Sequence, residues 1–267
     1  SKLRSFLSLV IDETIIDDAD NRGIQALPNL EFKFVTANTL IGLEEKQQTQ
    51  GAFDFGQTDE LQDQLKTIRN QYLQAYGEEK KQLKKDFEEI QNKIFKQEIA
   101  GGGQNKRALQ LASWKPFSNE SNTWFDPYWM YGVEKFDIVI GNPPYVSIRT
   151  KSFNNDFKNE YKSKYELAVG QYDLYVLFLE KSNSLLVNNG ILDFIIPTRF
   201  LSNETFKDAR KYLYDKCRVN LYLNAEMPFE SANVEANSLL CIKGSNNNSV
   251  RTFKYSSKKR DINFQSE

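Results

Sequence analysis

The sequence predicts an α/β fold in which a largely parallel sheet carries an inserted helical hairpin. Residues 136–140 and 191–196 are short apolar runs rich in β-branched side chains, as is typical of central strands. Residues 172–187, between them, have the apolar spacing of an amphipathic helix. A strand, a helix and a strand in this order form a βαβ unit, whose two strands run parallel.

Residues 59–99 contain the helical pattern that predicts the hairpin. Gly77 interrupts this pattern, which indicates two antiparallel helices. The charged outer positions favour a solvated insertion, and an arm that docks a neighbouring domain or DNA is the alternative. The glycines at 101–103 follow a helix rather than a strand, so we expect a linker there and not a nucleotide-binding loop. Apolar residues recur at spacings of four, three and four at Leu61, Leu65, Ile68 and Tyr72, and again at Leu83, Phe87, Ile90 and Ile94.

Two apolar segments precede the hairpin. Residues 3–11 have apolar side chains at spacings of three and four, which favours a helix and leaves a strand open. Residues 30–35 alternate between apolar and polar side chains, which predicts a strand that residues 36–40 close. Because the first segment starts at full hydrophobic strength without a helix cap, we expect the chain to be part of a longer protein.

The chain after residue 187 is expected to continue the sheet. Asn188–Gly190 predict a glycine cap at the end of the preceding helix. Pro197 cannot donate to a sheet ladder and therefore ends the strand at 191–196. Asn203 is a candidate N-cap for a helix that runs to about residue 214. Further strands are expected at 219–223, 238–243 and about 250–255.

Composition excludes several classes of site. The chain has 35 Lys and Arg against 36 Asp and Glu, so it is no polycation, and any bound DNA must be held by a local patch or by surfaces outside this chain. It has no histidine, which excludes Ser-His-Asp and Cys-His catalysis. With two cysteines and no histidine, we expect no metal site.

The two cysteines and the hydropathy indicate where the protein acts. Cys217 and Cys241 lie in apolar, strand-like runs, which predicts core thiols of a reducing compartment rather than a disulfide. The sequence contains neither a signal peptide nor an apolar run long enough to span a membrane. We therefore expect a cytoplasmic protein.

Aromatic residues are dense on both sides of the strand at 136–140. Residues 124–132 favour packing near the edge of a site, with a stacking platform for bases as the alternative. Residues 149–165 interleave Lys and Arg with Phe and Tyr, a pattern that suits contacts with phosphates and unstacked bases. A solvated loop fits this second pattern equally well.

The most informative stretch lies where the strand at 136–140 ends. Gly141 lets the backbone turn closely, and Pro143 and Pro144 fix φ at two successive positions. Ligands of open α/β sheets bind beyond the carboxyl ends of the strands. The side chains of Asn142 and Tyr145 are therefore expected where chemistry takes place.

Asn142-Pro143-Pro144-Tyr145 resembles the signature of the amino-methyltransferases. From its first residues to about residue 244, the chain resembles the adenine-specific DNA methyltransferase region of type IIG restriction–modification proteins. Other matching segments are Leu-Ser-Leu-Val-Ile-Asp-Glu at 7–13, Leu-Pro-Asn-Leu-Glu at 27–31, Asp-Pro at 126–127 and Tyr-Asp-Leu-Tyr at 172–175. The resemblance implies a Rossmann-like methyltransferase sheet with an antiparallel strand at one edge and S-adenosylmethionine as the cofactor.

The resemblance also implies roles for individual residues. Asn142 and the Pro143 carbonyl would accept the two N–H groups of a planar amine, and Pro144 would stiffen this catalytic turn. Tyr145 and Phe229 would stack on a base flipped out of the duplex, although a lone phenylalanine is more often a core anchor.

Four further assignments come from the resemblance and from the local charge. Asn38 would bond the adenine of S-adenosylmethionine, or is an ordinary residue at the end of a strand. Asn142 would line the same cofactor site. Arg149 and Lys151, in the most basic part of the chain, would bind DNA.

Parts of the family pattern are missing. The glycine-rich motif and the acidic residue that hold the cofactor are expected before Ser1, together with any nuclease. A target-recognition domain is expected after the tail. The predicted division is 1–46 for the N-terminal part of the core, 47–123 for the helical insertion and linkers, 124–244 for the catalytic part, and 245–267 for the tail.

The predicted function is N6-methylation of adenine in double-stranded DNA by a prokaryotic restriction–modification system, with this chain as a fragment of the enzyme. One alternative is a methyltransferase that acts on another planar amine, such as a protein glutamine side chain. The other is a non-catalytic module whose functional surface is the helical hairpin.

Overall fold

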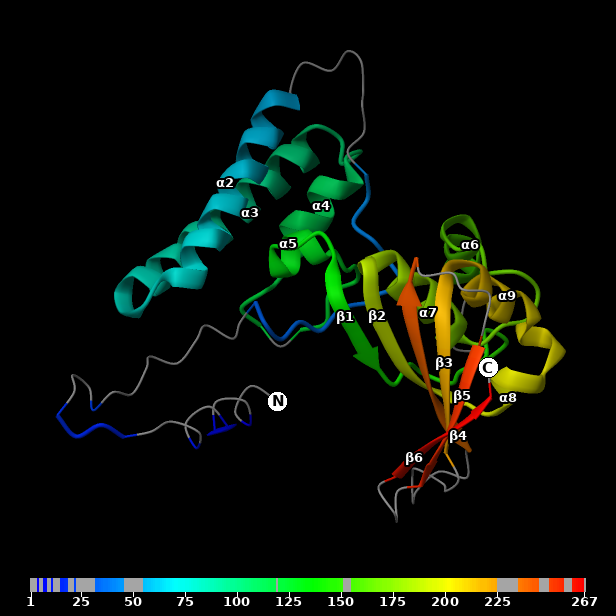
Figure 1. Cartoon of the computed structure of the whole chain (residues 1–267). Helices are drawn as coiled ribbons and strands as arrows, with labels where there is room; N and C mark the ends of the chain where they lie inside the picture. The colour runs from blue at the N-terminus through cyan, green and yellow to red at the C-terminus, as the bar shows by residue number, and fades with distance from the viewer. Residues whose placement is uncertain are drawn as a thin grey trace. The chain divides into compact units, whose positions relative to one another are not determined.

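The structure is a computed structural model that contains two compact units, residues 1–132 and 133–267 (Figure 1). Arg4, Leu7, Ser8 and Ile11 are helical, as the apolar spacing at 3–11 predicts. The described residues are 32–45, 55–118, 120–150, 155–224, 235–244, 250–256 and 261–266, together with Arg4, Leu7, Ser8, Ile11, Ile15–Asp18 and Arg22.

The first unit is built on the predicted helical hairpin. Helix α2 covers Phe55–Gln74 and helix α3 covers Gly77–Ala100, so the prediction of two helices is confirmed. Gly77 has φ of +58°, a left-handed conformation that glycine adopts without strain at the bend between them. Two short helices follow, α4 at Lys106–Ser113 and α5 at Pro127–Tyr131. Residues 101–103 connect α3 to α4, as a linker does.

An aromatic cluster forms the core of the first unit and explains one wrong prediction. Residues 32–34 form a turn and a bend rather than part of a strand at 30–35. The Phe32 ring packs edge-to-face against Tyr72 and Trp114, with centroid separations of 5.5 and 5.6 Å. Burial of this side chain against the helices overrides the strand preference of the local sequence. Isolated parallel bridges, Ala37 with Asn122 and Gly42 with Phe125, take the place of a strand.

The second unit is a six-stranded mixed sheet of order β1-β2-β4-β3-β5-β6. The pairings show that β1, β2, β3 and β5 run in one direction and that β4 and β6 run in the other. Strand β6, at one edge of the sheet, is antiparallel to its neighbour, as predicted. A second antiparallel strand, β4, lies inside the sheet between β2 and β3, because it follows β3 in the chain and pairs with it. The strands are β1 Phe136–Gly141, β2 Leu186–Pro197, β3 Cys217–Asn224, β4 Ala236–Lys243, β5 Val250–Ser256 and β6 Asp261–Ser266.

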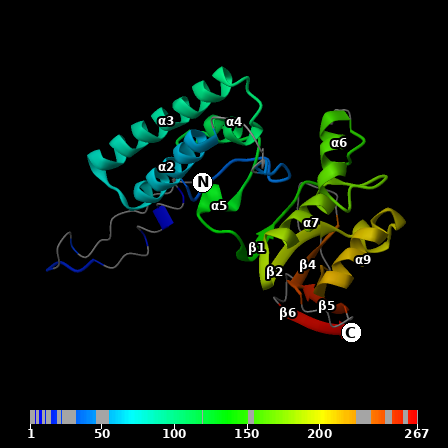
Figure 2. The ribbon, with the colours of Figure 1, turned by 90° about the horizontal axis from the view of Figure 1, so that it is seen from above.

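Helices α7 and α9 lie on the same side of this sheet (Figure 2). Helix α7, Leu174–Leu185, connects the parallel neighbours β1 and β2, so the predicted βαβ unit is confirmed. The core between helices and sheet includes Tyr175, Leu192, Ile196 and Leu213. The remaining helices are α6 Asn155–Lys164, α8 Arg199–Ser202, the 3-10 turn η2 Glu204–Phe206 and α9 Lys207–Lys216.

Two caps at helix ends had different outcomes. Asn203 is an N-cap as predicted, since it accepts a hydrogen bond from the Thr205 amide, but it caps the 3-10 turn that precedes α9 rather than α9 itself. The predicted glycine cap at 188–190 is wrong, because α7 ends at Leu185 and β2 begins at Leu186. Asn189, with φ of +63°, takes the left-handed conformation in an irregular part of β2. Gly190 is required there for close approach, since an added Cβ would lie 3.1 Å from the Asp137 carbonyl of β1.

Cys217 and Cys241 are buried and free, which confirms the prediction of core thiols.

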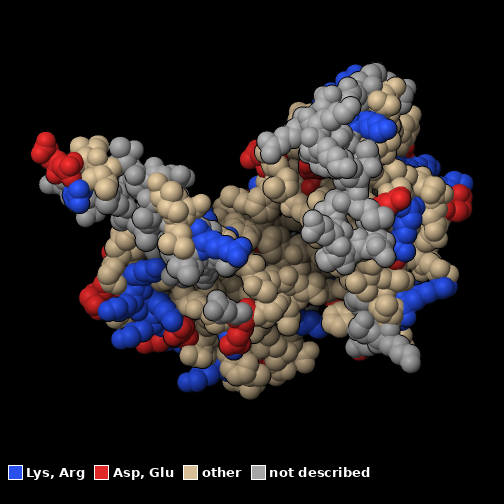
Figure 3. Space-filling model, turned by 90° about the horizontal axis from the view of Figure 1, so that it is seen from below, with Lys and Arg blue, Asp and Glu red and all other residues tan. Residues whose placement is uncertain are grey.

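Within the described ranges, no group of three or more His, Cys, Asp and Glu side chains is placed to hold a metal ion. Among the helices of the same ranges, none combines the length and the apolar character needed to cross a bilayer. On the face shown in Figure 3, side chains of both charges occur on the described residues.

Candidate active site at the carboxyl ends of β1 and β2

The Asn-Pro-Pro-Tyr segment forms a turn that begins where β1 ends. Gly141, the last residue of β1, lies opposite Phe194 of the parallel strand β2. Pro143 is buried, whereas Asn142 is exposed. Within the described part of the chain, the amide of Asn142 has no hydrogen-bond partner. The turn therefore presents a free side-chain oxygen and NH2 group on a backbone that the buried proline holds in place.

Tyr145 anchors the other end of the turn. Its hydroxyl donates a hydrogen bond of 2.8 Å to the Ile195 carbonyl of β2. Its ring packs edge-to-face on Tyr175 of α7, with a centroid separation of 5.8 Å and an interplanar angle of 82°. Burial raises the pKa of the Tyr145 hydroxyl, which therefore stays a protonated donor at neutral pH. The Tyr145 side chain is half-buried, so part of its surface remains accessible.

The chain after the turn is fixed to the start of α7. The Leu174 amide donates to the Val146 carbonyl at 2.8 Å, and the Ile148 amide donates to the Tyr172 carbonyl at 3.1 Å. These two bonds make a short antiparallel bridge between Ser147 and Asp173. The turn is thus held on one side by β2 and on the other by the residues that open α7.

Asp173 and Arg199 form an ion pair at the same edge of the sheet. The Asp173 side chain is 8% exposed and the Arg199 side chain is 53% exposed. Burial raises the pKa of the Asp173 carboxyl, and the Arg199 guanidinium opposes this shift. No local sequence pattern predicts a role for either residue. The position of Arg199, two residues after the proline that ends β2, is the signal that could have marked it.

Asn38 belongs to the first unit and lies in a local turn. Its Oδ1 accepts a hydrogen bond of 3.2 Å from the Leu40 amide. Its own backbone amide donates to the Asn122 carbonyl at 2.9 Å. Within the described ranges, the side-chain NH2 of Asn38 has no partner and is available to an acceptor.

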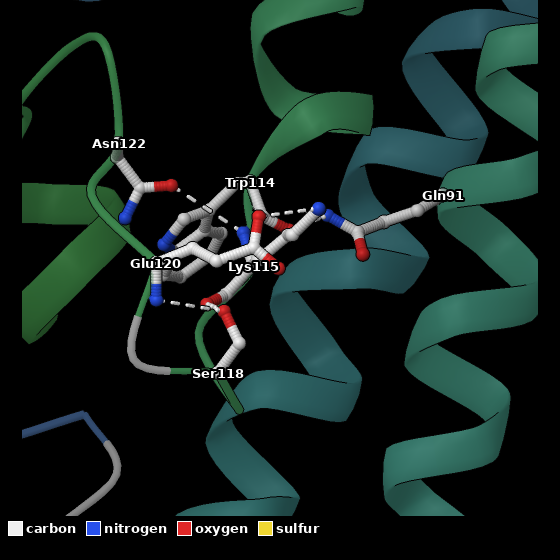
Figure 4. A network of polar contacts seen from close by, with 6 residues as sticks. All are labelled: Gln91, Trp114, Lys115, Ser118, Glu120 and Asn122. Carbon is white, nitrogen blue, oxygen red and sulfur yellow. Dashed lines mark hydrogen bonds and ion pairs between the residues drawn. The ribbon is translucent and has the colours of Figure 1, made fainter.

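Asn122, whose carbonyl accepts from the Asn38 amide, belongs to a network of polar contacts that reaches Gln91 of α3 (Figure 4). The Asn122 Oδ1 accepts from the Lys115 amide at 3.4 Å. The neighbouring Trp114 carbonyl accepts from Gln91 of α3 at 2.6 Å. Gln91 also donates to the Leu111 carbonyl at 2.8 Å. The buried amide of α3 therefore holds the end of α4.

The structure limits the other predicted contacts. Arg149 is exposed, so its guanidinium is accessible to solvent. Lys151 and Phe229 lie outside the described residues. The basic aromatic segment forms helix α6 over residues 155–164, and Tyr161 and Tyr165 are buried, which leaves their rings unavailable to bases. In the aromatic run at 124–132, Trp124 and Trp129 are each 1% exposed, as packing requires.

Comparison with known proteins gives the family. The family model described as "Eco57I restriction-modification methylase" matches residues 1–229. The type II restriction enzyme and methyltransferase RM.Eco57I of Escherichia coli is 38% identical over 106 residues, which is 39% of this chain and 10% of that protein. RM.MjaORFECS2P of Methanocaldococcus jannaschii is 25% identical over 275 residues, 81% of this chain and 22% of that protein.

Another curated relative and a solved structure also match. The type II methyltransferase M.BstVI of Geobacillus stearothermophilus is 35% identical over 114 residues, 42% of this chain and 20% of that protein. The crystal structure of the EcoKI M protein matches with a TM-score of 0.36 and 19% identity, over 58% of this chain and 33% of that one. The chain spans less than a quarter of each of these three curated relatives. It belongs to the Eco57I restriction-modification methylase family.

Proposed function

We propose that this chain is the catalytic part of an S-adenosylmethionine-dependent DNA methyltransferase that modifies N6 of adenine within a restriction–modification system of the prokaryotic cytoplasm. The main support is the exposed amide of Asn142, which has no partner in the described part of the chain and follows directly on the carboxyl end of β1. Ligands of α/β sheets bind at such strand ends.

The turn suits a planar amine as the substrate. The lone pair of an exocyclic adenine NH2 is delocalised into the ring, so the nitrogen is a weak nucleophile. Asn142 Oδ1 can accept one of its N–H groups and the Pro143 carbonyl the other, which returns electron density to the nitrogen. Burial of Pro143 and the bond of Tyr145 to Ile195 hold the backbone of the turn, and with it the Pro143 carbonyl, in place. Positioning of this kind provides much of the acceleration in a two-substrate reaction.

The residues present fit the cofactor. S-adenosylmethionine, when bound, supplies a methyl group activated by a cationic sulfonium. The side-chain NH2 of Asn38 is a donor suited to a ring nitrogen of its adenine. An amide hydrogen-bonds a neutral heterocycle without the desolvation cost of a charged group.

An adenine inside a duplex cannot reach such a turn, so the base must be flipped out at a cost of a few kcal/mol. The accessible part of the Tyr145 ring would stack on the flipped base, with Phe229 on its other side. Stacking contributes about 1–3 kcal/mol per base and offsets that cost. Arg149 and Lys151 would hold the neighbouring phosphates. Other parts of the longer protein would supply target recognition, the remaining cofactor contacts and any nuclease.

Incubation of the full-length protein with DNA and methyl-labelled S-adenosylmethionine, followed by separation of the nucleosides, tests the proposal. We expect the label in N6-methyldeoxyadenosine. Label in a protein glutamine, with unlabelled DNA, would overturn the choice of substrate. No heat on titration of the full-length protein with S-adenosylmethionine would overturn methyl transfer altogether.

A further inference from the structure

We propose that Arg199 binds a backbone phosphate of the target strand beside the flipped nucleotide, and that Asp173 is the positioning residue for its guanidinium. The inference rests on the proposed function, because it takes DNA as the substrate. It adds a binding residue from α8, which follows β2, to a site that is otherwise built on the turn after β1.

Arg199 lies at the same sheet edge as the Asn-Pro-Pro-Tyr turn. Strands β1 and β2 are parallel neighbours, so their carboxyl ends meet at that edge. Tyr145 donates to Ile195, which is four residues before Arg199. The rings also connect the two positions, because Tyr175 packs on Tyr145 at 5.8 Å and on Phe200 at 6.0 Å.

The guanidinium of Arg199 is fixed on one side and open on the other. One Nη donates to the Asp173 carboxylate. In the described part of the chain the other donors have no partner, and a guanidinium has five N–H donors in a planar fork. The side chain is 53% exposed, so a free edge faces solvent. Such an edge matches two phosphate oxygens.

Arg210 provides a contrast within the same part of the fold. Its Nη1 donates to the Phe200 carbonyl at 2.7 Å and to the Asn203 carbonyl at 2.8 Å. Arg210 therefore ties down the residues just after Arg199. With the local backbone held by Arg210, Arg199 is not needed for that purpose.

Asp173 is placed to orient Arg199 rather than to cap its own helix. It occupies the N-cap position of α7, yet its side chain makes no cap hydrogen bond and instead pairs with Arg199. Main-chain bonds from Leu174 to Val146 and from Ile148 to Tyr172 hold its backbone against the segment after the turn. The carboxylate thus couples the direction of the guanidinium to the position of the turn.

The test uses the full-length protein, with DNA affinity measured as a function of salt. Loss of one phosphate contact lowers the magnitude of the slope of log K against log salt by about 0.9. We expect that change, with roughly tenfold weaker binding, for Arg199→Gln. Arg199→Lys keeps the charge and should keep the slope, but with weaker affinity, because a lysine cannot form the bidentate contact.

Lys216→Gln is the matched control. Lys216 is 48% exposed and directly precedes β3, which runs in the same direction as β1 and β2, so it lies at the opposite sheet edge. Its loss should leave the slope unchanged. Asp173→Asn should raise KM for DNA at nearly constant kcat, with the parent slope, since Arg199 keeps its charge.

A salt slope in Arg199→Gln equal to that of the parent would overturn the inference. If the melting temperature of that variant also fell, the ion pair of Asp173 and Arg199 would serve stability alone. This failure is distinguishable from failure of the proposed function. If only the role of Arg199 is wrong, the parent protein methylates DNA and the variant binds DNA as the parent does. If the proposed function is wrong, the parent itself transfers no methyl group to DNA.

Discussion

The residues of the Asn-Pro-Pro-Tyr turn differ in burial. Pro143 is buried and Tyr145 is tied to β2, whereas Asn142 is exposed. Sequence could predict this turn, because its residues are adjacent in the chain and follow a clear strand. It could not predict the pair of Asp173 and Arg199, whose side chains are 26 residues apart and meet only after β2 has paired with β1.

Two substitutions at Tyr145 distinguish the role of its hydroxyl from the role of its ring. Tyr145→Phe removes the donor to the Ile195 carbonyl and should lower the free energy of unfolding by about 0.5–1.5 kcal/mol, with methylation retained. Tyr145→Ala removes the ring as well. The stacking free energy of about 1–3 kcal/mol is then lost, so KM for DNA should rise. Denaturant unfolding and methyl-transfer kinetics measure the two effects. If the Phe variant is as impaired in methyl transfer as the Ala variant, the ring does not stack on the base.

Among the secondary-structure elements, the helical hairpin and the βαβ unit were predicted because each has a long, regular apolar pattern. The predictions of a strand at 30–35 and of a helix cap at 188–190 were wrong for the same reason. Phe32 is buried among Tyr72, Trp114 and other rings, and Gly190 is pressed against β1. Both contacts are made with residues distant in the chain, which a local pattern does not contain.

Gly190→Ala tests the close approach of β2 to β1. The added Cβ would lie 2.9 Å from the Val187 carbonyl and 3.1 Å from the Asp137 carbonyl, and both are backbone atoms that move little. We expect a loss of about 1–3 kcal/mol in the free energy of unfolding. Gly42→Ala is the control, since its Cβ would meet nothing within 4 Å. Equal stability of the two variants would contradict the packing described at Gly190.

Gln91 tests the attachment of α3 to α4. Gln91→Ala leaves the carbonyls of Leu111 and Trp114 without their side-chain donor, which should cost about 1–3 kcal/mol. Gln82 on the same helix donates to Asp86 at the surface, so Gln82→Ala should cost less than about 0.5 kcal/mol. Urea unfolding followed by tryptophan fluorescence gives both values. A similar cost for the two variants would mean that the buried amide does not hold α4.

At the scale of the whole molecule, the two units have cores formed from their own residues. The first is centred on Phe32, Phe87 and Trp114, and the second on the sheet and its helices. Family membership could be anticipated from the sequence, because its motifs are local. The division into units could not, since the aromatic run at 124–132 precedes β1 without a break in composition, yet α5 within it belongs to the first unit.

The tryptophans allow the units to be followed separately. All three, Trp114, Trp124 and Trp129, lie in the first unit. Leu192→Ala, at a site 1% exposed in the second unit, should cost about 2–5 kcal/mol in the circular-dichroism transition of the strands and leave the fluorescence transition in place. Leu111→Ala in the first unit should shift the fluorescence transition instead. A common shift of both signals in either variant would mean that the units unfold as one.

Methyl transfer by Asn142→Ala in the full-length protein is the most direct test of the Asn-Pro-Pro-Tyr turn as the catalytic site. Asn188→Ala is the control, an exposed asparagine near the amino end of β1, at the opposite edge of the sheet. We expect the Asn142 variant to lose at least about a hundredfold in methyl-transfer rate, because it loses one of the two acceptors for the substrate amine, while DNA affinity persists. The control should match the parent. Parent-like methylation by Asn142→Ala would contradict the catalytic role of the turn.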